Sequence, residues 1–299
     1  MINLSDIKSK EERIYYAEAN YNRVLQQYPR EIKECINNTH RYCQEILSKE
    51  ELPPKRWEHT DIELLYTDSV TCLFDNAGDD VALLNFASFK NPGGLYLNGS
   101  PAQEESLCHQ SILYPVLEAF REPYYKPHLK QLNNSLYIDD MLYTRDIVFF
   151  DYELKDMGGT HKEHVMKRLA TADVITCAAP NVSSYWKYRA GALEESVVAE
   201  IITSRIEFVI NAAIREGRSE IILGAFGCGV FGNDPEAIAY IFHRMLTGCY
   251  DGYFKTAYFP IPKGNNNFRK FVKVFMEFPT DQMSIEEVEE YADLKLEEF

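Results

Sequence analysis

The sequence predicts a three-layer α/β fold built on a mixed or mostly parallel sheet, with additional helices before it. From residue 61 onward, short β-branched runs alternate with segments of helical periodicity, as in α/β domains. Before that point, charged and apolar residues recur at helical spacing. We therefore expect a helical extension at 1–55, an α/β domain at 56–280 and an acidic C-terminal helix at 281–299.

The expected elements follow from these patterns in chain order. Two or three helices fill the first 50 residues, and Pro29 suits the first turn of one of them. Asp234 with Pro235, and Ser284 with Glu287, predict the starts of two later helices. Strands are expected at 62–74, 81–88, 135–150, 173–179, 220–226 and 256–261, and helices at 103–121, about 161–169, 193–216 and 235–247.

Charge and cysteine content exclude several classes of protein. The 46 acidic and 31 basic residues give a net charge of −15, which disfavours broad electrostatic binding to nucleic acid or anionic membranes. The seven cysteines contain no CxxC pair, so neither a disulfide framework nor a zinc site is predicted. No stretch approaches a span of about 18 apolar residues, and the first residues do not resemble a secretion signal. We expect a cytoplasmic, monomeric protein that does not bind membranes.

The stretch SPAQEES, residues 100–106, has the pattern of a helix start. Ser100, Pro101 and Gln103 match an N-cap, a proline in the first turn and a capping-box glutamine, so a helix should begin near Pro101. Glu104 and Glu105 would then lie in or beside its first turn. Acids there stabilise the helix dipole even without a ligand, which is the alternative to a catalytic role.

A glycine loop precedes these acids and favours the catalytic interpretation. Gly93 and Gly94 tolerate unusual backbone angles and let the main chain approach a ligand closely. Asn85 and Ser88 end the preceding strand, where open α/β sheets place their ligands, although both could simply cap the strand.

A second glycine loop, residues 224–234, follows an apolar strand and precedes a helix. Gly227, Gly229 and Gly232 spell GxGxxG, and the N–H groups of such a loop can bind a phosphate. A tight turn without a ligand remains an alternative. The dinucleotide-fold interpretation lacks a second strand ending in an acid about 20 residues later. Taken together, the loops suggest a nucleotide-sugar site, with one loop on a diphosphate and the other presenting a carboxyl group to a ribose.

Three motifs resemble those of the microbial-type poly(ADP-ribose) glycohydrolase family, a branch of the macrodomain superfamily. They are NFASFKNPGG with AQEES, TCAAPN at 176–181, and LGAFGCGVFGNDP at 223–235. They occur in order over most of residues 60–265. The resemblance implies a macrodomain-like fold and hydrolysis of the ribose–ribose O-glycosidic bond of poly(ADP-ribose), releasing ADP-ribose without a metal or cofactor.

The resemblance also implies roles for individual residues. Glu105 would be the catalytic acid and then the base, and Glu104 would position the substrate ribose. Asn85 would lie beside that ribose, Phe231 would pack near it, and the backbone of 224–232 would bind the diphosphate. The remaining substrate-binding positions would be Ser88, Gly93, Gly94, Gln103, Gly227, Cys228, Gly229, Val230 and Gly232.

One departure from the family pattern bears on efficiency and substrate. The family usually has a third consecutive glycine where this chain has Leu95. If that position requires a positive φ, the leucine costs about 1 kcal/mol, and it could also block the ligand. Two other functions stay open: a macrodomain that binds ADP-ribose without cleaving it, and a hydrolase that removes single ADP-ribose groups from protein or nucleic acid. A nicotinamide-dependent oxidoreductase is disfavoured.

Other candidate groups have simpler interpretations. His161 and His164 have a metal-ligand spacing on a predicted helix, but a solvated helix face is favoured because no partner motif is visible. Cys228 lacks a neighbouring base in the sequence, so packing is favoured over nucleophilic catalysis. Asp139 and Asp140 are interpreted as strand-edge acids.

Overall fold

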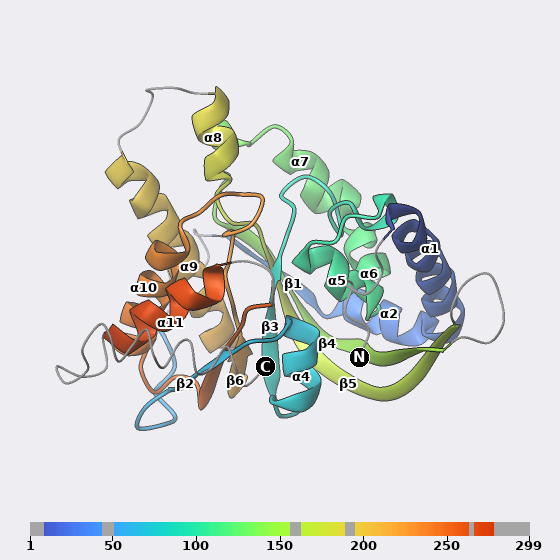
Figure 1. Ribbon diagram of the computed structural model, residues 1–299, viewed down its shortest axis with the longest axis horizontal. Helices are drawn as coiled ribbons and strands as arrows, with labels where there is room; N and C mark the ends of the chain where they lie inside the picture. Colours follow the sequence, from blue (N-terminus) through green and yellow to red (C-terminus); the bar gives the residue numbers. More distant parts are fainter. Residues whose placement is uncertain (1–8, 44–50, 156–162, 189–194, 263–265, 278–299) are drawn as a thin grey trace. The chain divides into compact units, whose positions relative to one another are not determined.

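The structure is a computed structural model that describes residues 9–43, 51–155, 163–188, 195–262 and 266–277 (Figure 1). The chain forms two compact units, each built from segments that are separated in sequence. The first unit comprises Met1–Tyr42, Ser69–Leu132 and Asp140–Ala178, and the second comprises Cys43–Asp68, Asn133–Asp139 and Ala179–Phe299. The predicted boundaries at residues 55 and 280 stay a prediction.

The strands of the first unit form a mixed sheet in the order β1 (Thr39–Cys43), β4 (Asp140–Lys155), β5 (Glu163–Cys177) and β3 (Val81–Phe86). β4 and β5 are antiparallel, whereas β3 and β5 are parallel, with Asn85 opposite Thr176. The first five residues of β3 are fully buried, as expected of an apolar run that is covered on both faces. This burial places the carboxyl end of β3, and the loop after it, on a rigid support.

The helices of the first unit include the two N-terminal ones. They are α1 (Lys10–Gln27), α2 (Pro29–Asn37), α4 (Ser69–Asp75), α5 (Gln103–His109), α6 (Leu113–Ala119) and α7 (Lys126–His128), with short turns η2 (Tyr96–Asn98) and η3 (Arg121–Tyr125). Pro29 occupies the first turn of α2, as predicted. α1, in dark blue, packs against α5 and α6, and α2, in lighter blue, packs against α6 (Figure 1). α1 therefore contacts the helix that carries Glu104 and Glu105, and α2 contacts the next helix.

The second unit contains parallel strands in the order β6 (Glu220–Ile222), β7 (Thr256–Pro260) and β2 (Asp61–Leu65). Its helices are α8 (Val182–Tyr188), α9 (Glu195–Glu216), α10 (Pro235–Leu246) and α11 (Asn267–Glu277), with a short turn η4 (Asn133–Ser135). α10 packs against α9 and α11 (Figure 1). Asp234 caps α10 by accepting hydrogen bonds from Glu236 and Ala237, which confirms the predicted start of that helix.

Three predicted elements are wrong. The segment predicted as a helix at 161–169 lies in β5 where it is described, because its ladder with β4 runs from Cys177 to Glu163 and overrides local propensity. The strand predicted at 62–74 ends at Leu65, and α4 follows it. The helix predicted at 103–121 is broken after His109, because residues 110–112 hydrogen-bond to β4 instead.

One predicted strand is shifted along the chain, to Asp140–Lys155, and another is shorter than expected. The strand predicted at 135–150 begins at Asp140, because Ser135 and Tyr137 have positive φ angles that a strand does not allow. The strand predicted at 220–226 ends at Ile222. The predicted C-terminal helix, with Ser284 and Glu287, lies outside the described residues.

Candidate active site

The two acids lie in the first turn of α5, but that helix begins later than predicted. Its first residue is Gln103 and its N-cap is Ala102, which makes no side-chain capping bond. The predicted start near Pro101 with Ser100 as the cap is therefore wrong. Both glutamates remain in the first turn, beside the glycine loop.

Gln103 has a structural role in place of the predicted capping one. Its Oε1 accepts a hydrogen bond from the N–H of Phe86 at 2.9 Å, and its Nε2 donates to the carbonyl oxygen of Leu84 at 2.9 Å. These bonds attach the start of α5 to the end of β3. They fix the orientation of the helix turn that carries the acids.

Glu104 is buried and is held by three N–H groups. Its Oε2 accepts from the main chain of Ser88 at 2.7 Å, its Oε1 accepts from Asn85 Nδ2 at 3.3 Å, and the N–H of Gly93 also bonds to it. Burial raises the pKa of Glu104 well above 4.5 and the charge of Glu105 adds to this rise, while the three hydrogen bonds oppose it. Glu104 is thus a carboxyl group positioned by protein donors on both oxygens.

Glu105 is 5% exposed and is held at one oxygen. Its Oε1 accepts a hydrogen bond from the N–H of Leu95 at 2.8 Å. Within the described part of the chain, this is the one hydrogen bond that its carboxyl group accepts. Its Oε2 therefore accepts no hydrogen bond from the described residues.

The glycine loop provides space for both carboxylates. Gly93 and Gly94 have φ angles of +64° and +60°. A Cβ atom on Gly94 would lie 2.5 Å from Glu105 Oε1 and 2.9 Å from Glu104 Oε2. Leu95, by contrast, has a φ of −110°, so the strain considered for a leucine at this position is absent. Its side chain is 54% exposed.

Asn85 and Ser88 complete the first group of predicted site residues. Asn85 is fully buried, and its Oδ1 accepts no hydrogen bond from the described residues. Such an unsatisfied buried acceptor is costly unless a ligand donates to it. The Oγ of Ser88 accepts from the N–H groups of Lys90 and Asn91 at 3.3 and 3.1 Å, so this hydroxyl shapes the loop.

The second glycine loop is closed by Asn233. Its Nδ2 donates to the carbonyl oxygens of Gly227 at 3.0 Å and Pro180 at 2.9 Å, which joins the loop to the TCAAPN motif. Gly227 has a φ of +73°, and a Cβ there would lie 2.6 Å from the Cβ of Ala179. Gly232, at φ +69°, packs against Ser183. The backbone path of this loop therefore depends on its glycines.

The remaining residues of this loop differ in exposure. A Cβ on Gly229 would meet no described atom within 4 Å, and Val230 is 82% exposed. Phe231 accepts a hydrogen bond from Ser183 N at 2.9 Å and packs edge-on against Tyr137 at 6.1 Å. Burial raises the pKa of the Cys228 thiol, which makes it a poor nucleophile.

The predicted site residues therefore form two groups, one in each unit. The first group gathers around the acid pair, and the second surrounds Asn233. Sequence reasoning missed Asn20, a buried residue of α1 that donates to Tyr96 Oη at 3.1 Å and to the Cys108 carbonyl at 3.0 Å. A single asparagine in an amphipathic helix gives no signal for this role.

The described residues offer neither a metal-binding cluster nor a membrane-spanning helix. His164 lies on β5 and not on a helix, and His161 lies outside the described residues. Among the residues that the structure describes, no group of three or more His, Cys, Asp or Glu side chains could hold a metal ion. No helix in the described ranges is long and apolar enough to cross a membrane.

Comparison with known proteins relates the chain to one family of enzymes. Residues 7–151 match the model of the microbial-type PARG catalytic domain, where PARG denotes poly(ADP-ribose) glycohydrolase. The chain is also similar to the crystal structure of poly(ADP-ribose) glycohydrolase from Thermomonospora curvata, with a TM-score of 0.76 and 27% identity over 89% of this chain and 100% of that one. These findings support a relation of the chain to the microbial-type PARG family.

Two ligand complexes of family members are also similar to the chain. The T. curvata enzyme bound to the inhibitor ADP-HPD has a TM-score of 0.72 and 27% identity, over 87% of this chain and 98% of that one. The enzyme from Deinococcus radiodurans in complex with ADP-ribose has a TM-score of 0.70 and 29% identity, over 83% and 98%. None of the curated proteins compared with the chain matches it.

These similarities confirm two predictions. The fold is the macrodomain-like α/β fold of these structures, with a mixed sheet and N-terminal helices. The protein is an enzyme of the glycohydrolase class.

Proposed function

We propose that this protein hydrolyses the ribose–ribose O-glycosidic bond of poly(ADP-ribose), with Glu105 as the acid and then the base. The observation that carries the proposal is the unequal environment of two buried carboxyl groups in one helix turn. Glu104 has protein donors on both oxygens, whereas Glu105 keeps Oε2 free. The solved PARG structures with bound ADP-ribose support ADP-ribose units as the ligand.

The reaction breaks the bond between the anomeric carbon and the bridging oxygen. Glu105 donates its proton to that oxygen, which leaves as a hydroxyl group, while positive charge develops on the ribose ring. A water molecule then adds to the anomeric carbon, and the Glu105 carboxylate takes the proton that the water loses. Glu105 ends the cycle protonated, as it began.

Two neighbours of Glu105 would hold the ribose during this cycle. Glu104, fixed by its three N–H donors, would hydrogen-bond a ribose hydroxyl group. The Oδ1 of Asn85 is a buried acceptor without a donor among the described residues, and a ribose hydroxyl would supply one. Both contacts would orient the anomeric carbon relative to Glu105.

We propose that the second glycine loop binds the diphosphate through main-chain N–H groups. The absence of described atoms near a Cβ on Gly229 leaves space for a ligand to approach the backbone. Neutral N–H donors suit a protein of net charge −15, because they bind an anion without a cationic surface.

Turnover by Glu105→Gln tests the catalytic role. We expect release of ADP-ribose from poly(ADP-ribose) to fall by about 100- to 10,000-fold, since the variant can neither donate nor accept the proton. Affinity for ADP-ribose, measured by calorimetry, should change little. Glu31→Gln is the matched control, because Glu31 lies in the first turn of another helix of the same unit.

Three results would contradict the proposal. Full turnover by Glu105→Gln would remove Glu105 from the reaction. Wild-type protein that binds ADP-ribose but releases none from the polymer would be a binding module. Release from singly modified protein or nucleic acid but not from the polymer would indicate a mono-ADP-ribosyl hydrolase.

A further inference from the structure

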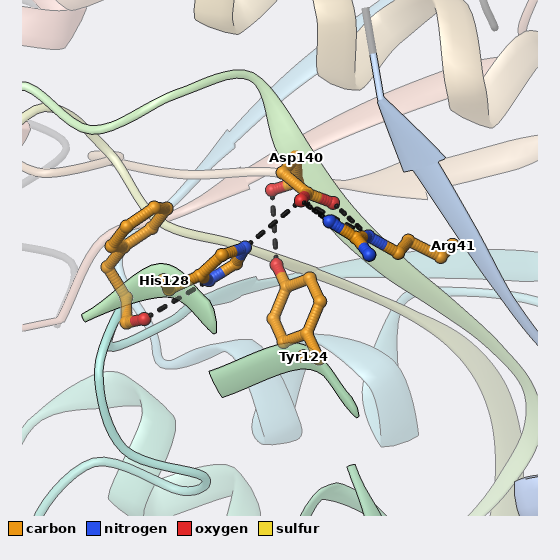
Figure 2. A network of polar contacts seen from close by, with 5 residues as sticks. Arg41, Tyr124, His128 and Asp140 are labelled. Carbon is orange, nitrogen blue, oxygen red and sulfur yellow. Dashed lines mark hydrogen bonds and ion pairs between the residues drawn. The ribbon is translucent and has the colours of Figure 1, made fainter. Parts of the chain in front are cut away.

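A buried polar network in the first unit ends on the loop that holds the acid pair (Figure 2). Its centre is Asp140, the first residue of β4, which is 1% exposed. The carboxyl group of Asp140 accepts from Arg41 Nε at 3.0 Å and lies 3.0 Å from His128 Nε2. The main-chain oxygen of Asp140 accepts from the hydroxyl of Tyr124 at 3.1 Å.

The carboxyl group at the centre of this network is ionised. Burial alone would raise the pKa of Asp140, but the hydrogen bonds from His128 and Arg41 outweigh it and hold that pKa below its usual value of 3.8. A carboxylate accepts hydrogen bonds and donates none, so His128 donates through Nε2. Asp140 therefore fixes the orientation of the imidazole ring.

His128 connects this network to the loop. Its ring stacks on the ring of Phe89, with centroids 4.0 Å apart and planes 4° from parallel. Its Nδ1 lies 3.3 Å from the main-chain oxygen of Phe89. Figure 2 shows the ring of His128 beside Asp140. Both Phe89 and His128 are buried, so water does not separate these groups.

Phe89 directly follows a residue that donates a hydrogen bond to the acid pair. The preceding residue, Ser88, donates its N–H to Glu104 at 2.7 Å, and its Oγ accepts from the N–H groups of Lys90 and Asn91. Further along the same loop, Leu95 donates to Glu105. A shift of Phe89 would therefore move the donors that place both carboxyl groups.

We propose that His128 is a positioning residue, which fixes the loop 88–95 and through it the carboxyl groups of Glu104 and Glu105. The proposal rests on the proposed function for its effect on catalysis. A buried ionic network gives little net stability compared with apolar packing, so a directional constraint is its stronger effect here. Displacing catalytic groups by about 1 Å costs on the order of 100-fold in rate.

The test compares His128→Phe with wild-type protein. Phenylalanine keeps an aromatic ring against Phe89 and removes both nitrogen contacts. We expect kcat for ADP-ribose release to fall by about 10- to 100-fold, with KM and ADP-ribose affinity within about threefold of wild type. Amide hydrogen exchange over residues 86–98 should accelerate by about tenfold or more, while exchange in α10 stays unchanged.

Asp151→Asn is the matched control. Asp151 is also a buried acid of β4 with an arginine partner, since Arg168 Nε donates to it at 2.9 Å. This arginine lies on β5 and not on the loop 88–95. This variant should leave kcat and the exchange of residues 86–98 unchanged, even if its thermal stability falls.

A second variant covers the case in which His128→Phe does not fold. Arg41→Gln removes one partner of Asp140 from a side chain that is 48% exposed, and should lower kcat and speed loop exchange in the same direction. Folded variants with wild-type kcat and wild-type exchange over 86–98 would overturn the proposal. If wild-type protein did not hydrolyse poly(ADP-ribose), the proposed function would fail, and the exchange measurement would still decide the role of His128.

Discussion

Gly94 illustrates at the residue scale how closely the acid pair is packed. The hydrogen that replaces a side chain at this position faces both carboxyl groups, and the positive φ also favours glycine. Glycine at this position is thus required twice, by backbone angle and by space. The next position does not require glycine, because Leu95 has a negative φ and a side chain that is half exposed.

Gly94→Ala should therefore lose activity as well as stability. A Cβ 2.5 Å from Glu105 Oε1 must displace that carboxyl group, so we expect turnover to fall by about 100-fold. Gly217→Ala is the matched control, because Gly217 has a φ of +78° but no described atom within 4 Å of its Cβ position. Both variants should lose about 1 kcal/mol of unfolding free energy from backbone strain. Equal activity in the two variants would contradict the packing described here.

Glu104 gives a second prediction at this scale, through pH. Because burial raises its pKa above 4.5, the folded protein binds a proton there that the unfolded chain releases. The stability that this proton contributes is fully present below about pH 4.5 and is lost as pH rises through the folded pKa.

Urea unfolding from about pH 4 to pH 8 measures this effect. The unfolding free energy of wild-type protein, relative to Glu104→Gln, should fall as pH rises above 4.5. The shift of Asp140 is common to both proteins and cancels in the difference. A difference that is flat, or that rises with pH, would show that burial does not raise the pKa of Glu104.

At the scale of elements, the sequence predicts the helices and strands whose bounds are set by neighbouring residues. α10 begins at Pro235 with Asp234 as its cap, and the described part of α9 lies within its predicted range and ends where predicted. α5 does not follow its local signal, because Gln103 bonds to β3 instead of capping the helix. The break before α6 likewise comes from bonds to β4, which is distant in sequence. Tertiary hydrogen bonds, absent from any local pattern, account for both differences.

For the candidate site, the sequence predicts which residues take part but not how they are hydrogen-bonded. The motifs identify Glu104, Glu105 and the glycines beside them, because their residue types and order carry the chemistry. They do not reveal that Glu104 has protein donors on both oxygens while Glu105 has one on a single oxygen. His128 gives no signal in the sequence, since a single histidine between Pro127 and Leu129 has no spacing or motif to interpret.

At the scale of the whole molecule, charge and connectivity constrain how a substrate is bound. A net charge of −15 repels an anionic polymer at long range, so attraction must be local and short-ranged. Main-chain N–H groups in glycine loops provide it without positive side chains. The N-terminal helices belong to the same unit as the acid pair, through the contacts of α1 and α2 with α5 and α6.

A crystal structure with bound ADP-ribose tests the central claim, the role of Glu105, most directly. We expect the Oε2 of Glu105 to lie about 2.6–3.2 Å from the oxygen on the anomeric carbon of the distal ribose. The Oδ1 of Asn85 should accept a hydrogen bond from the same sugar. A ribose beyond hydrogen-bond reach of Glu105, or one whose anomeric oxygen lies nearer to the carboxyl group of Glu104, would contradict the assignment of Glu105 as the acid.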